Sequence, residues 1–391
     1  FTMFKKSYRH NIALVGASEF FGFFGITSFW LLFLSQHGMS FGQIGILESL
    51  FHLTSLLSEV PSGVLADRFT YRTNLYLGRL MSILSCLFML FGQGHFWIYA
   101  FGMVLNAWAY NFDSGTSTAM LFESAKEAGL EDKFLKFSSF VSAVAEATRT
   151  LGAVVAGFFV HGLLDMTYVI QIFFSLIVII LITMMKEPAF KKEREEPASL
   201  SCILKTVVQE FKVNRLLFYW FITSQVFCVM MCMFYFYYQN ELDIFPSWQI
   251  SLLMLISSVI NIGAVWLASK IGKRFKAVAL LPILVGVTGM LYVLAITKLP
   301  LIYMIIYLMA DGLYAFFLPI FNNDLQVMIP SDVRATMLSV TAMFFSLFMI
   351  VIFPMTGFLI DWLGFSLTFL LLGFVLMLLA PLFILKRNDL K

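Results

Sequence analysis

The sequence predicts an all-α membrane protein of twelve transmembrane helices in two six-helix bundles. Hydrophobic residues make up 60% of its 391 residues and charged residues only 13%, whereas about a quarter of a soluble domain is charged. A helix needs roughly 20 apolar residues to cross a bilayer, and such stretches recur along the chain between short polar joints. Lipid is therefore the solvent for most of the chain. The net charge of +3 gives no reason to expect nucleic acid as a partner.

Twelve apolar stretches are expected to span the membrane. In chain order they are 10–35, 41–66, 74–93, 96–122, 134–161, 166–185, 216–240, 248–269, 277–297, 300–327, 333–360 and 365–385. The joints between them are very short, and the sequence has no Asn-x-Ser/Thr acceptor for a glycan. Both features fit a multi-pass protein of a bacterial plasma membrane.

The basic residues predict how these spans are oriented. With the N-terminus inside, the cytosolic joints and termini hold Lys5, Lys6, Arg9, Arg68, Arg72, Arg79, Lys126, Lys133, Lys136, Lys270, Lys273, Arg274, Lys276, Arg334, Lys386, Arg387 and Lys391. The opposite face keeps only Lys298. Because basic residues resist translocation, this asymmetry places both termini in the cytosol and requires an even number of spans.

One long polar segment, residues 186–215, divides the chain into bundles at residues 1–185 and 216–391. Its part at 199–211 is typical of an amphipathic helix lying on the membrane surface. A shift of 206 residues superimposes five identical residues of the two bundles, namely Gln43, Ile44, Leu47, Arg68 and Phe69 over Gln249, Ile250, Leu253, Arg274 and Phe275. The match agrees with the hydropathy pattern and favours a duplicated six-plus-six architecture.

The joint between the second and third spans carries Gly63, Asp67, Arg68 and Arg72 at the spacing G-x-x-x-D-R-x-x-x-R. Here the sequence resembles the major facilitator superfamily, whose signature is G-x-x-x-D-R-x-G-R-[RK], although Thr70 and Tyr71 depart from it. The resemblance implies the twelve-helix fold of that superfamily.

The resemblance also implies a gate. Asp67 would hold the cytosolic side shut by meeting the start of the eleventh span, where residues 330–332 read Pro-Ser-Asp. A carboxylate is favoured at a helix N-terminus. Glu123, near the cytosolic end of the fourth span, is expected to form a structural salt bridge with Arg72 or Arg68. Lys273 stands where a second aspartate would be, so the latch is expected to be one-sided.

Two further stretches are similar to bacterial drug-efflux members of the superfamily: residues 114–116 together with Glu123, and residues 329–336. In the fifth span, residues 152–157 keep the small residues that mark the antiporters of the family. However, Ala153 stands where those antiporters have proline. Close helix packing through small residues four positions apart accounts for this stretch equally well.

Four acidic residues, Glu19, Asp113, Glu146 and Asp311, are expected near the bilayer midplane. At about 1.5 Å per residue, each lies about 15–20 Å along its helix from a charged or proline residue at a membrane surface. An ionisable group facing lipid there costs from about 3 to more than about 10 kcal/mol, so it normally lines a polar cavity or carries a function. The family fold places spans one, four, seven and ten around a central cavity, and three of these acids lie in them.

Other polar residues are expected to line the same cavity. Asn106, Tyr110, Asp113 and Ser117 recur at helical spacing in the fourth span. On the seventh span, the aromatic run at residues 234–238 ends in Gln239 and is a candidate aromatic lining. Arg149 lies one turn from Glu146, and the pair is interpreted either as an internal salt bridge or as part of the transport chemistry.

The favoured function is secondary active transport by alternating access. Acids outnumber bases in the expected cavity, which favours proton-coupled export, by antiport, of a small amphipathic or cationic compound. The alternatives are import of a nutrient by proton symport, and transport of a lipid. Sodium is the alternative coupling ion, and the sequence specifies neither the substrate nor the direction of transport.

A membrane-embedded enzyme or receptor is disfavoured. The sequence contains no HExxH, no phosphate-binding loop and no Ser/His/Asp arrangement that geometry could support. Its cysteines lack the partners of a metal site. The protein is therefore predicted to be a monomeric transporter without metal or cofactor. Its expected partners are the lipid bilayer, protons and a small-molecule substrate.

Overall fold

The computed structural model describes residues 6–113, 115–189, Lys205, Val208, Gln209, Lys212, 215–328 and 334–387. Within helices it describes only the backbone at residues 60–67, Leu216, Met328, 334–339 and 383–387. All regular secondary structure in these residues is helical, and nine of the helices are long and apolar enough to cross a membrane. The predicted all-α membrane fold is confirmed.

The described chain forms two compact units. Unit 1 contains Phe1–Gly38, Leu50–Pro197 and Phe245–Met254, and unit 2 contains Met39–Ser49, Ala198–Ile244 and Leu255–Lys391. The helices of the first half of the chain are α1 (Tyr8–Gly22), α2 (Trp30–Gln36), α3 (Phe41–Arg68), α4 (Tyr71–Leu90), α5 (Phe96–Asp113), α6 (Thr116–Glu127), α7 (Phe134–Ala156) and α8 (Leu164–Met184). Those of the second half are α10 (Arg215–Tyr237), α11 (Ser247–Ile271), α12 (Ala277–Val293), α13 (Pro300–Met328), α14 (Arg334–Leu363) and α15 (Phe365–Arg387).

Each of the twelve predicted spans coincides with one helix or with two consecutive ones in the described residues. The first span is α1 and α2, joined by a short 3-10 turn at Gly25–Thr27. The fourth span is α5 and α6, because Gly115 has a φ of +82° that ends the regular helix. The predicted domain borders at residues 185 and 216 enclose a segment that lies largely outside the described residues, and they stay a prediction.

Polar contacts fix the helix ends of unit 1. The hydroxyls of Ser7 and Thr70 accept hydrogen bonds from the N–H groups of His10 and Thr73, which caps α1 and α4. The amide of buried Asn11 donates to the Ser124 hydroxyl at 2.8 Å and to the Lys186 carbonyl at 2.7 Å. These bonds tie α1 to α6 and to the segment after α8.

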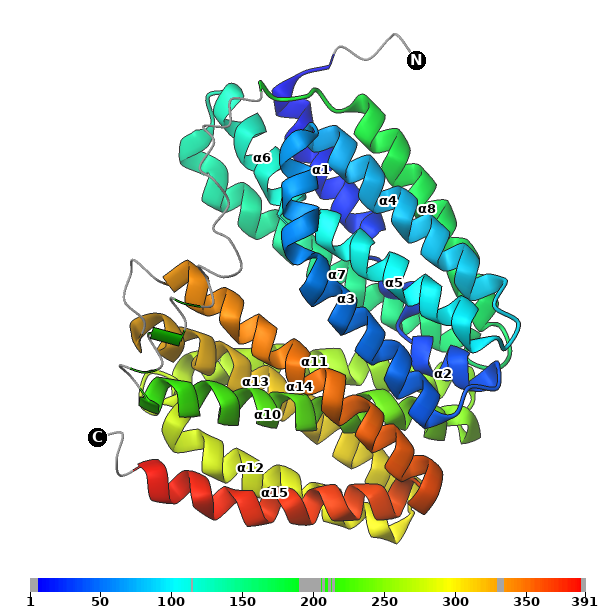
Figure 1. Cartoon of the computed structure of the whole chain (residues 1–391), viewed down its shortest axis with the longest axis vertical. Coiled ribbons are helices and arrows are strands. Elements are labelled where there is room, and N and C mark those ends of the chain that lie inside the picture. Colours follow the sequence, from blue (N-terminus) through cyan, green and yellow to red (C-terminus); the bar gives the residue numbers. More distant parts are fainter. Residues whose placement is uncertain are drawn as a thin grey trace. The chain divides into compact units, whose positions relative to one another are not determined.

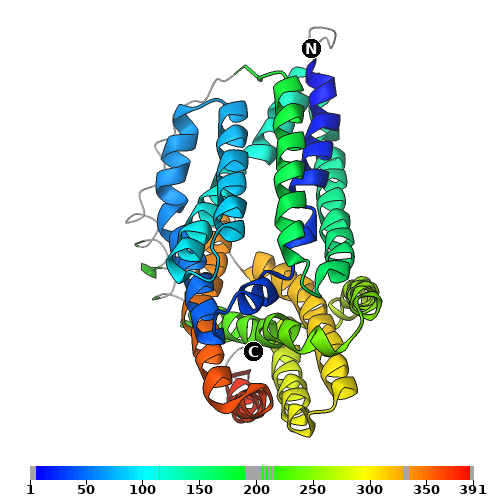
Figure 2. The same ribbon diagram turned by 90° about the vertical axis from the view of Figure 1, so that its right-hand side faces the viewer.

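The core of unit 1 is apolar. Val15, Leu75, Met120, Val178 and Ile182 are buried in one cluster contributed by α1, α4, α6 and α8. In Figures 1 and 2, α8 runs beside α1, and it also packs against α4. The polar site described below is bordered by this cluster, so its position is fixed by ordinary core packing.

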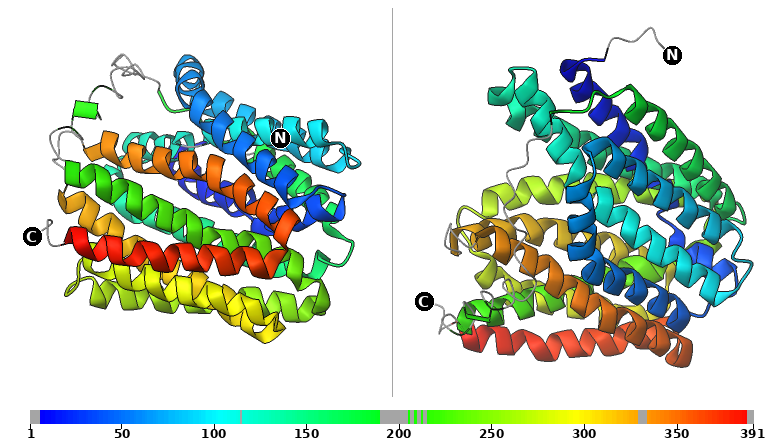
Figure 3. Two further views of the ribbon diagram at one scale, coloured as in Figure 1. Left: turned by 60° about the horizontal axis from the view of Figure 1, so that its bottom comes forward. Right: turned by 45° about the horizontal axis from the view of Figure 1, so that its top comes forward.

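Unit 2 has an aromatic core. The ring of Phe234 on α10 lies 4.8 Å from that of Phe369 on α15 and 5.6 Å from that of Tyr292 on α12. Helices α12 and α15 run side by side (Figure 3). The aromatic run at 234–238 therefore packs largely inside unit 2, with Phe234, Tyr237 and Tyr238 at most 1% exposed. This differs from its interpretation as a cavity lining, because hydropathy does not distinguish a packed aromatic face from an open one.

The small residues of the fifth span do serve close packing. A Cβ atom at Gly152 of α7 would collide with the backbone of Gly25 in the turn between α1 and α2. Gly157 lies in the turn that follows α7, and a Cβ atom there would collide with Ser251 of α11.

Substituting Gly152 by alanine is therefore expected to destabilise the protein by about 1–3 kcal/mol, the usual cost of overpacking. Gly16 of α1 is a matched control, since a Cβ there meets no atom within 4 Å. Gly16→Ala should be neutral or slightly stabilising, because alanine favours helix over glycine. Thermal unfolding of both variants in detergent gives the comparison. Equal midpoints would contradict the close approach.

Candidate functional site

Two adjoining cavities in unit 1 hold most of its midplane polar residues. The small cavity, about 10 Å³, is lined by Val15, Ser18, Glu19, Leu75, Arg79, Asp113, Ser117, Val178, Ile182 and Met185. The large cavity, about 120 Å³, is lined by Glu19, Phe23, Ser117, Thr118, Leu121, Ser138, Val141, Ser142, Ala145 and Arg149. Glu19 and Ser117 line both, so α1 and α6 form the wall between them.

The small cavity contains an ion pair. The guanidinium of Arg79 on α4 pairs with the carboxylate of Asp113, the last residue of α5. The side chain of Arg79 is 9% exposed and that of Asp113 is 17% exposed. Arg79 also approaches the carbonyl of Gly22, where any side chain larger than glycine would crowd the guanidinium.

Arg79 corrects the sequence interpretation, which counted it among the bases of the cytosolic joints. It lies two turns beyond Arg72, inside the predicted third span at 74–93, so its depth was readable from the sequence. What the sequence could not show is its partner. With Arg79 beside it, Asp113 is already neutralised, and it is a weaker candidate for carrying a proton than its depth suggested.

Glu19 has a different environment. Its carboxylate accepts a hydrogen bond from the Ser117 hydroxyl, and no lysine or arginine among the described residues forms a salt bridge with it. Arg79 and Arg149 act on it only through longer-range electrostatics. Glu19 is thus an acid at a cavity wall whose direct partner is a neutral hydroxyl.

Asp311 on α13 has a similar environment in unit 2. Its carboxylate accepts hydrogen bonds from the Ser257 hydroxyl and, at 2.9 Å, from the Asn261 amide, both on α11. Ser257 and Asn261 are one turn apart, so they lie on one helix face. In the described part of the chain no basic side chain pairs with Asp311. Glu19 in unit 1 and Asp311 in unit 2, both expected near the midplane, are therefore each bound by neutral side-chain donors.

Glu146 and Arg149 form the expected pair, with Nη1 of Arg149 2.8 Å from Oε2 of Glu146. The side chains are 68% and 54% exposed on unit 1, so the pair is not sealed in the core. Arg149 also lies over the ring of Phe23, with its Cζ 5.7 Å from the ring centroid. It lines the large cavity, whereas Glu146 does not.

The remaining predicted lining residues are dispersed. Asn106 and Tyr110 are exposed on α5 and line neither cavity. The helix breaks at Gly115, so Ser117 no longer continues their stripe along one regular helix. Gln239 is 5% exposed in unit 2. A period of 3.6 residues predicts a shared face only while the helix is unbroken.

The predicted cytosolic gate is only partly visible. The side chain of Asp67 and residues 330–332 lie outside the described residues, and only the backbone of Gly63 is described. The latch therefore stays a prediction. Arg68 is exposed.

Arg72 does not make the expected salt bridge with Glu123 in the described residues. It donates to the carbonyls of Ile182 and Thr183 at the end of α8, at 3.1 and 3.3 Å. Carbonyls at a helix C-terminus are natural partners for a cation. A nearby carboxylate, Glu187, accepts from the N–H groups that begin α4.

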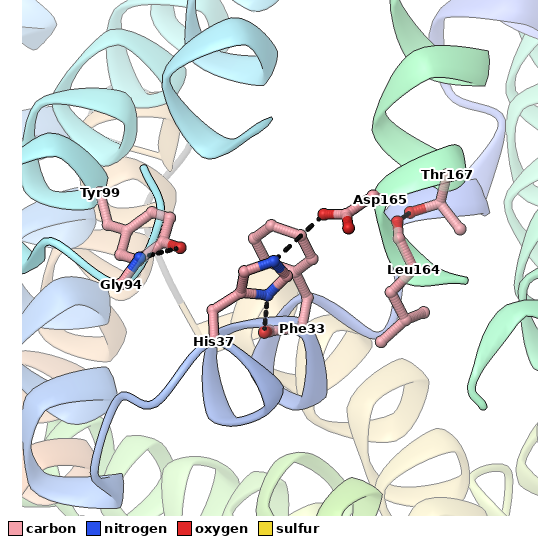
Figure 4. Close-up of polar contacts among 7 residues, drawn as sticks. All are labelled: Phe33, His37, Gly94, Tyr99, Leu164, Asp165 and Thr167. Carbon is pink, nitrogen blue, oxygen red and sulfur yellow. Dashed lines mark hydrogen bonds and ion pairs between the residues drawn. The ribbon is translucent and has the colours of Figure 1, made fainter. Parts of the chain in front are cut away.

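One polar cluster in unit 1 was not anticipated from the sequence (Figure 4). His37 follows α2, and its Nδ1 lies 2.8 Å from the carbonyl oxygen of Phe33, while its Nε2 lies 3.2 Å from a carboxylate oxygen of Asp165 on α8. Nearby, the hydroxyl oxygen of Tyr99 accepts from the Gly94 N–H. The cluster joins α2 to α8 and lies apart from the two cavities.

Comparison with known proteins is consistent with this architecture. The model of the family described as "Major Facilitator Superfamily" matches residues 12–354. No curated protein matches the sequence significantly.

Three solved structures illustrate the fold likeness. A mutant of the nucleoside transporter NupG is 12% identical, covers 97% of this chain and 99% of its own, and has a TM-score of 0.76. A bacterial homologue of the human lysosomal transporter Spinster is 15% identical with a TM-score of 0.71, covering 97% and 96%. A D-xylose–proton symporter is 14% identical with a TM-score of 0.65, covering 96% and 97%. At these identities the likeness is one of fold.

Proposed function

The chain belongs to the major facilitator superfamily, and from this premise we propose that it exchanges protons for a small solute carrying a cationic group. As a member it is a multi-pass membrane protein and a secondary transporter rather than an enzyme. The proposal adds the coupling ion, the charge of the solute and the direction. Export is favoured, because the proton gradient across a bacterial plasma membrane drives protons inward.

The proposal rests on the environment of Glu19. It lines both cavities of unit 1, its hydrogen-bond partner is the Ser117 hydroxyl, and no base in the described part of the chain forms a salt bridge with it. Burial disfavours the ionised carboxylate, so Glu19 takes up a proton when its cavity is closed to water. A cationic group entering the cavity favours the ionised form and expels that proton. Proton and solute then compete for one carboxylate, which is the basis of exchange.

Asp311 provides a second protonatable group in unit 2. Its two neutral donors, Ser257 and Asn261, stabilise the carboxylate without neutralising it. Asp113 and Glu146 are already paired with Arg79 and Arg149. Of the four acids expected at the midplane, Glu19 and Asp311 are therefore the better candidates for coupling.

Import of a polar nutrient by proton symport is the second candidate. The observation in its favour is the number of hydroxyl groups lining the large cavity, contributed by Ser117, Thr118, Ser138 and Ser142. Hydroxyls suit a hydrogen-bonding solute better than an amphipathic drug. Lipid transport receives no comparable support from a cavity of about 120 Å³.

The remaining features belong to the same proposal. The protein acts as a monomer in a bacterial plasma membrane. Both of its termini lie in the cytosol, an orientation that the distribution of basic residues predicts. It needs no cofactor, and the proton gradient is its energy source.

Flux measurements in reconstituted vesicles test the proposal. Small amines, amino acids, nucleosides and sugars are first screened by thermal shift on the purified protein. The strongest ligand is then followed in vesicles with an imposed pH gradient and without sodium. We expect accumulation that requires the pH gradient and collapses with a protonophore. Accumulation that needs sodium, or that ignores the pH gradient, would contradict proton coupling.

A further inference from the structure

We propose that the large cavity of unit 1 binds a small zwitterion, with its ammonium group at Glu19 and its carboxylate at Arg149. This inference rests on the proposed function for the role of Glu19 and adds a second charge to the solute. It names a chemical class, amino acids and short amino acid analogues.

The first observation is the charge of the lining. Glu19 from α1 and Arg149 from α7 both line the cavity. They are near enough for Arg149 to act electrostatically on Glu19, yet they form no salt bridge with each other. An acid and a base that share a cavity without pairing present a ligand with two separate, opposite charges. A molecule carrying both an ammonium and a carboxylate complements this arrangement.

The second observation concerns the donors of Arg149. A guanidinium has five N–H donors in a fixed fork, and Arg149 uses Nη1 to reach Glu146. It is held over the ring of Phe23, so the fork is oriented while donors remain for a ligand. Arginine binds carboxylates through two parallel hydrogen bonds, which makes a carboxylate the natural partner on this side of the cavity.

The third observation is the polar face of α7. Ser138, Ser142, Ala145 and Arg149 are spaced by four, three and four residues, and all four line the cavity. Ser117 of α6 completes the wall next to Glu19. Hydroxyls both donate and accept, so they can satisfy the polar groups of a ligand between its two charges.

Size excludes larger ligands. The cavity of about 120 Å³ is well below the roughly 300–1,000 Å³ of pockets for drug-sized molecules. A simple cation would fit but would leave Arg149 without a ligand partner. A simple anion would leave Glu19 beside a second negative charge.

Binding of three matched probes to the purified full-length protein tests the class. The probes are 4-aminobutyrate, n-butylamine and butyrate, which share a four-carbon chain and differ in their charges. Glycine and leucine extend the series to α-amino acids. We expect the best zwitterion to bind roughly 10- to 100-fold more tightly than butylamine or butyrate, because a hydrogen bond to a charged group contributes about 1.5–3 kcal/mol.

Two variants test whether the carboxylate of the ligand binds at Arg149. Arg149→Met should reduce zwitterion affinity roughly 10- to 100-fold. Butylamine affinity should stay the same or rise slightly, because the variant removes a positive charge that acts on Glu19. Glu146→Gln is the matched control, since Glu146 contacts Arg149 but does not line the cavity, and it should keep zwitterion affinity. Because Arg149 is 54% exposed, these variants are expected to fold.

The outcomes separate this inference from the proposed function. If butylamine binds as tightly as every zwitterion, if no zwitterion binds, or if Arg149→Met leaves zwitterion affinity unchanged, the zwitterion assignment is wrong, whereas proton-coupled transport of a cation stands. If a zwitterion binds through Arg149 but its flux ignores the pH gradient, the binding site stands and the proposed coupling fails.

Discussion

Substituting Glu19 by glutamine is expected to abolish gradient-driven transport, reducing it to the level of vesicles without protein. Glutamine keeps the shape and can still accept the hydrogen bond from Ser117, but it cannot take up or release a proton. Exchange of labelled for unlabelled solute without a gradient should persist at saturating solute concentration, because the conformational cycle itself needs no titration at this residue. Vesicle flux with and without a pH gradient measures both quantities.

Asp113→Asn is the informative comparison for this result. Asp113 lines the small cavity next to Glu19 but is paired with Arg79, so its loss should lower protein stability rather than uncouple the protein that remains folded. Asp311→Asn should reduce coupling if the acid of unit 2 also carries a proton. Should Glu19→Gln still concentrate solute against its gradient, Glu19 is not the coupling residue, and Asp311 becomes the first alternative.

Hydropathy was sufficient to predict the fold. Each of the twelve predicted spans coincides with a helix or two consecutive helices in the described chain, because apolar length and the spacing of basic joints are properties of the sequence itself. The break at Gly115 was not predicted. One glycine within an apolar segment does not show whether the helix continues, since glycine is tolerated inside membrane helices.

The candidate site was predicted in part. The depth of Glu19 and Asp311 followed from the rise per residue along their helices. Their partners did not, because Ser117 and Ser257 come from other helices and hydrogen-bond to them only in the folded state. Counting acids against bases likewise omitted Arg79, whose pairing with Asp113 removes one acid from the apparent surplus.

The sequence also did not show which of the two arginine–carboxylate pairs of unit 1 is buried. From the sequence, Glu146 and Arg149 looked like a buried pair, because they lie one turn apart at midplane depth. In the structure they are more than half exposed on unit 1, whereas the pair that no local spacing indicated, Arg79 with Asp113, is mostly buried. Burial depends on what packs against a helix face, and that is decided by residues far away in the chain.

Because the two pairs differ in burial, breaking each of them should change the free energy of unfolding by a different amount. Removing one partner of a buried ion pair leaves a charge without compensation and typically costs about 3–5 kcal/mol. A pair that water reaches is screened and contributes roughly 0–1 kcal/mol, and Arg149 of the exposed pair borders the large polar cavity. The two pairs of unit 1 therefore allow a comparison within a single protein.

Asp113→Asn and Arg79→Met are each expected to lower the free energy of unfolding by about 3–5 kcal/mol, because each leaves the other residue charged in the small cavity. The double variant should recover much of this loss, since it leaves no unpaired charge. Glu146→Gln should change stability by at most about 1 kcal/mol. Thermal and denaturant unfolding of the purified variants in detergent measures the differences. If the double variant is as unstable as the sum of the single ones, the two residues do not act as a pair. If Glu146→Gln destabilises as much as Asp113→Asn, burial does not distinguish the two pairs.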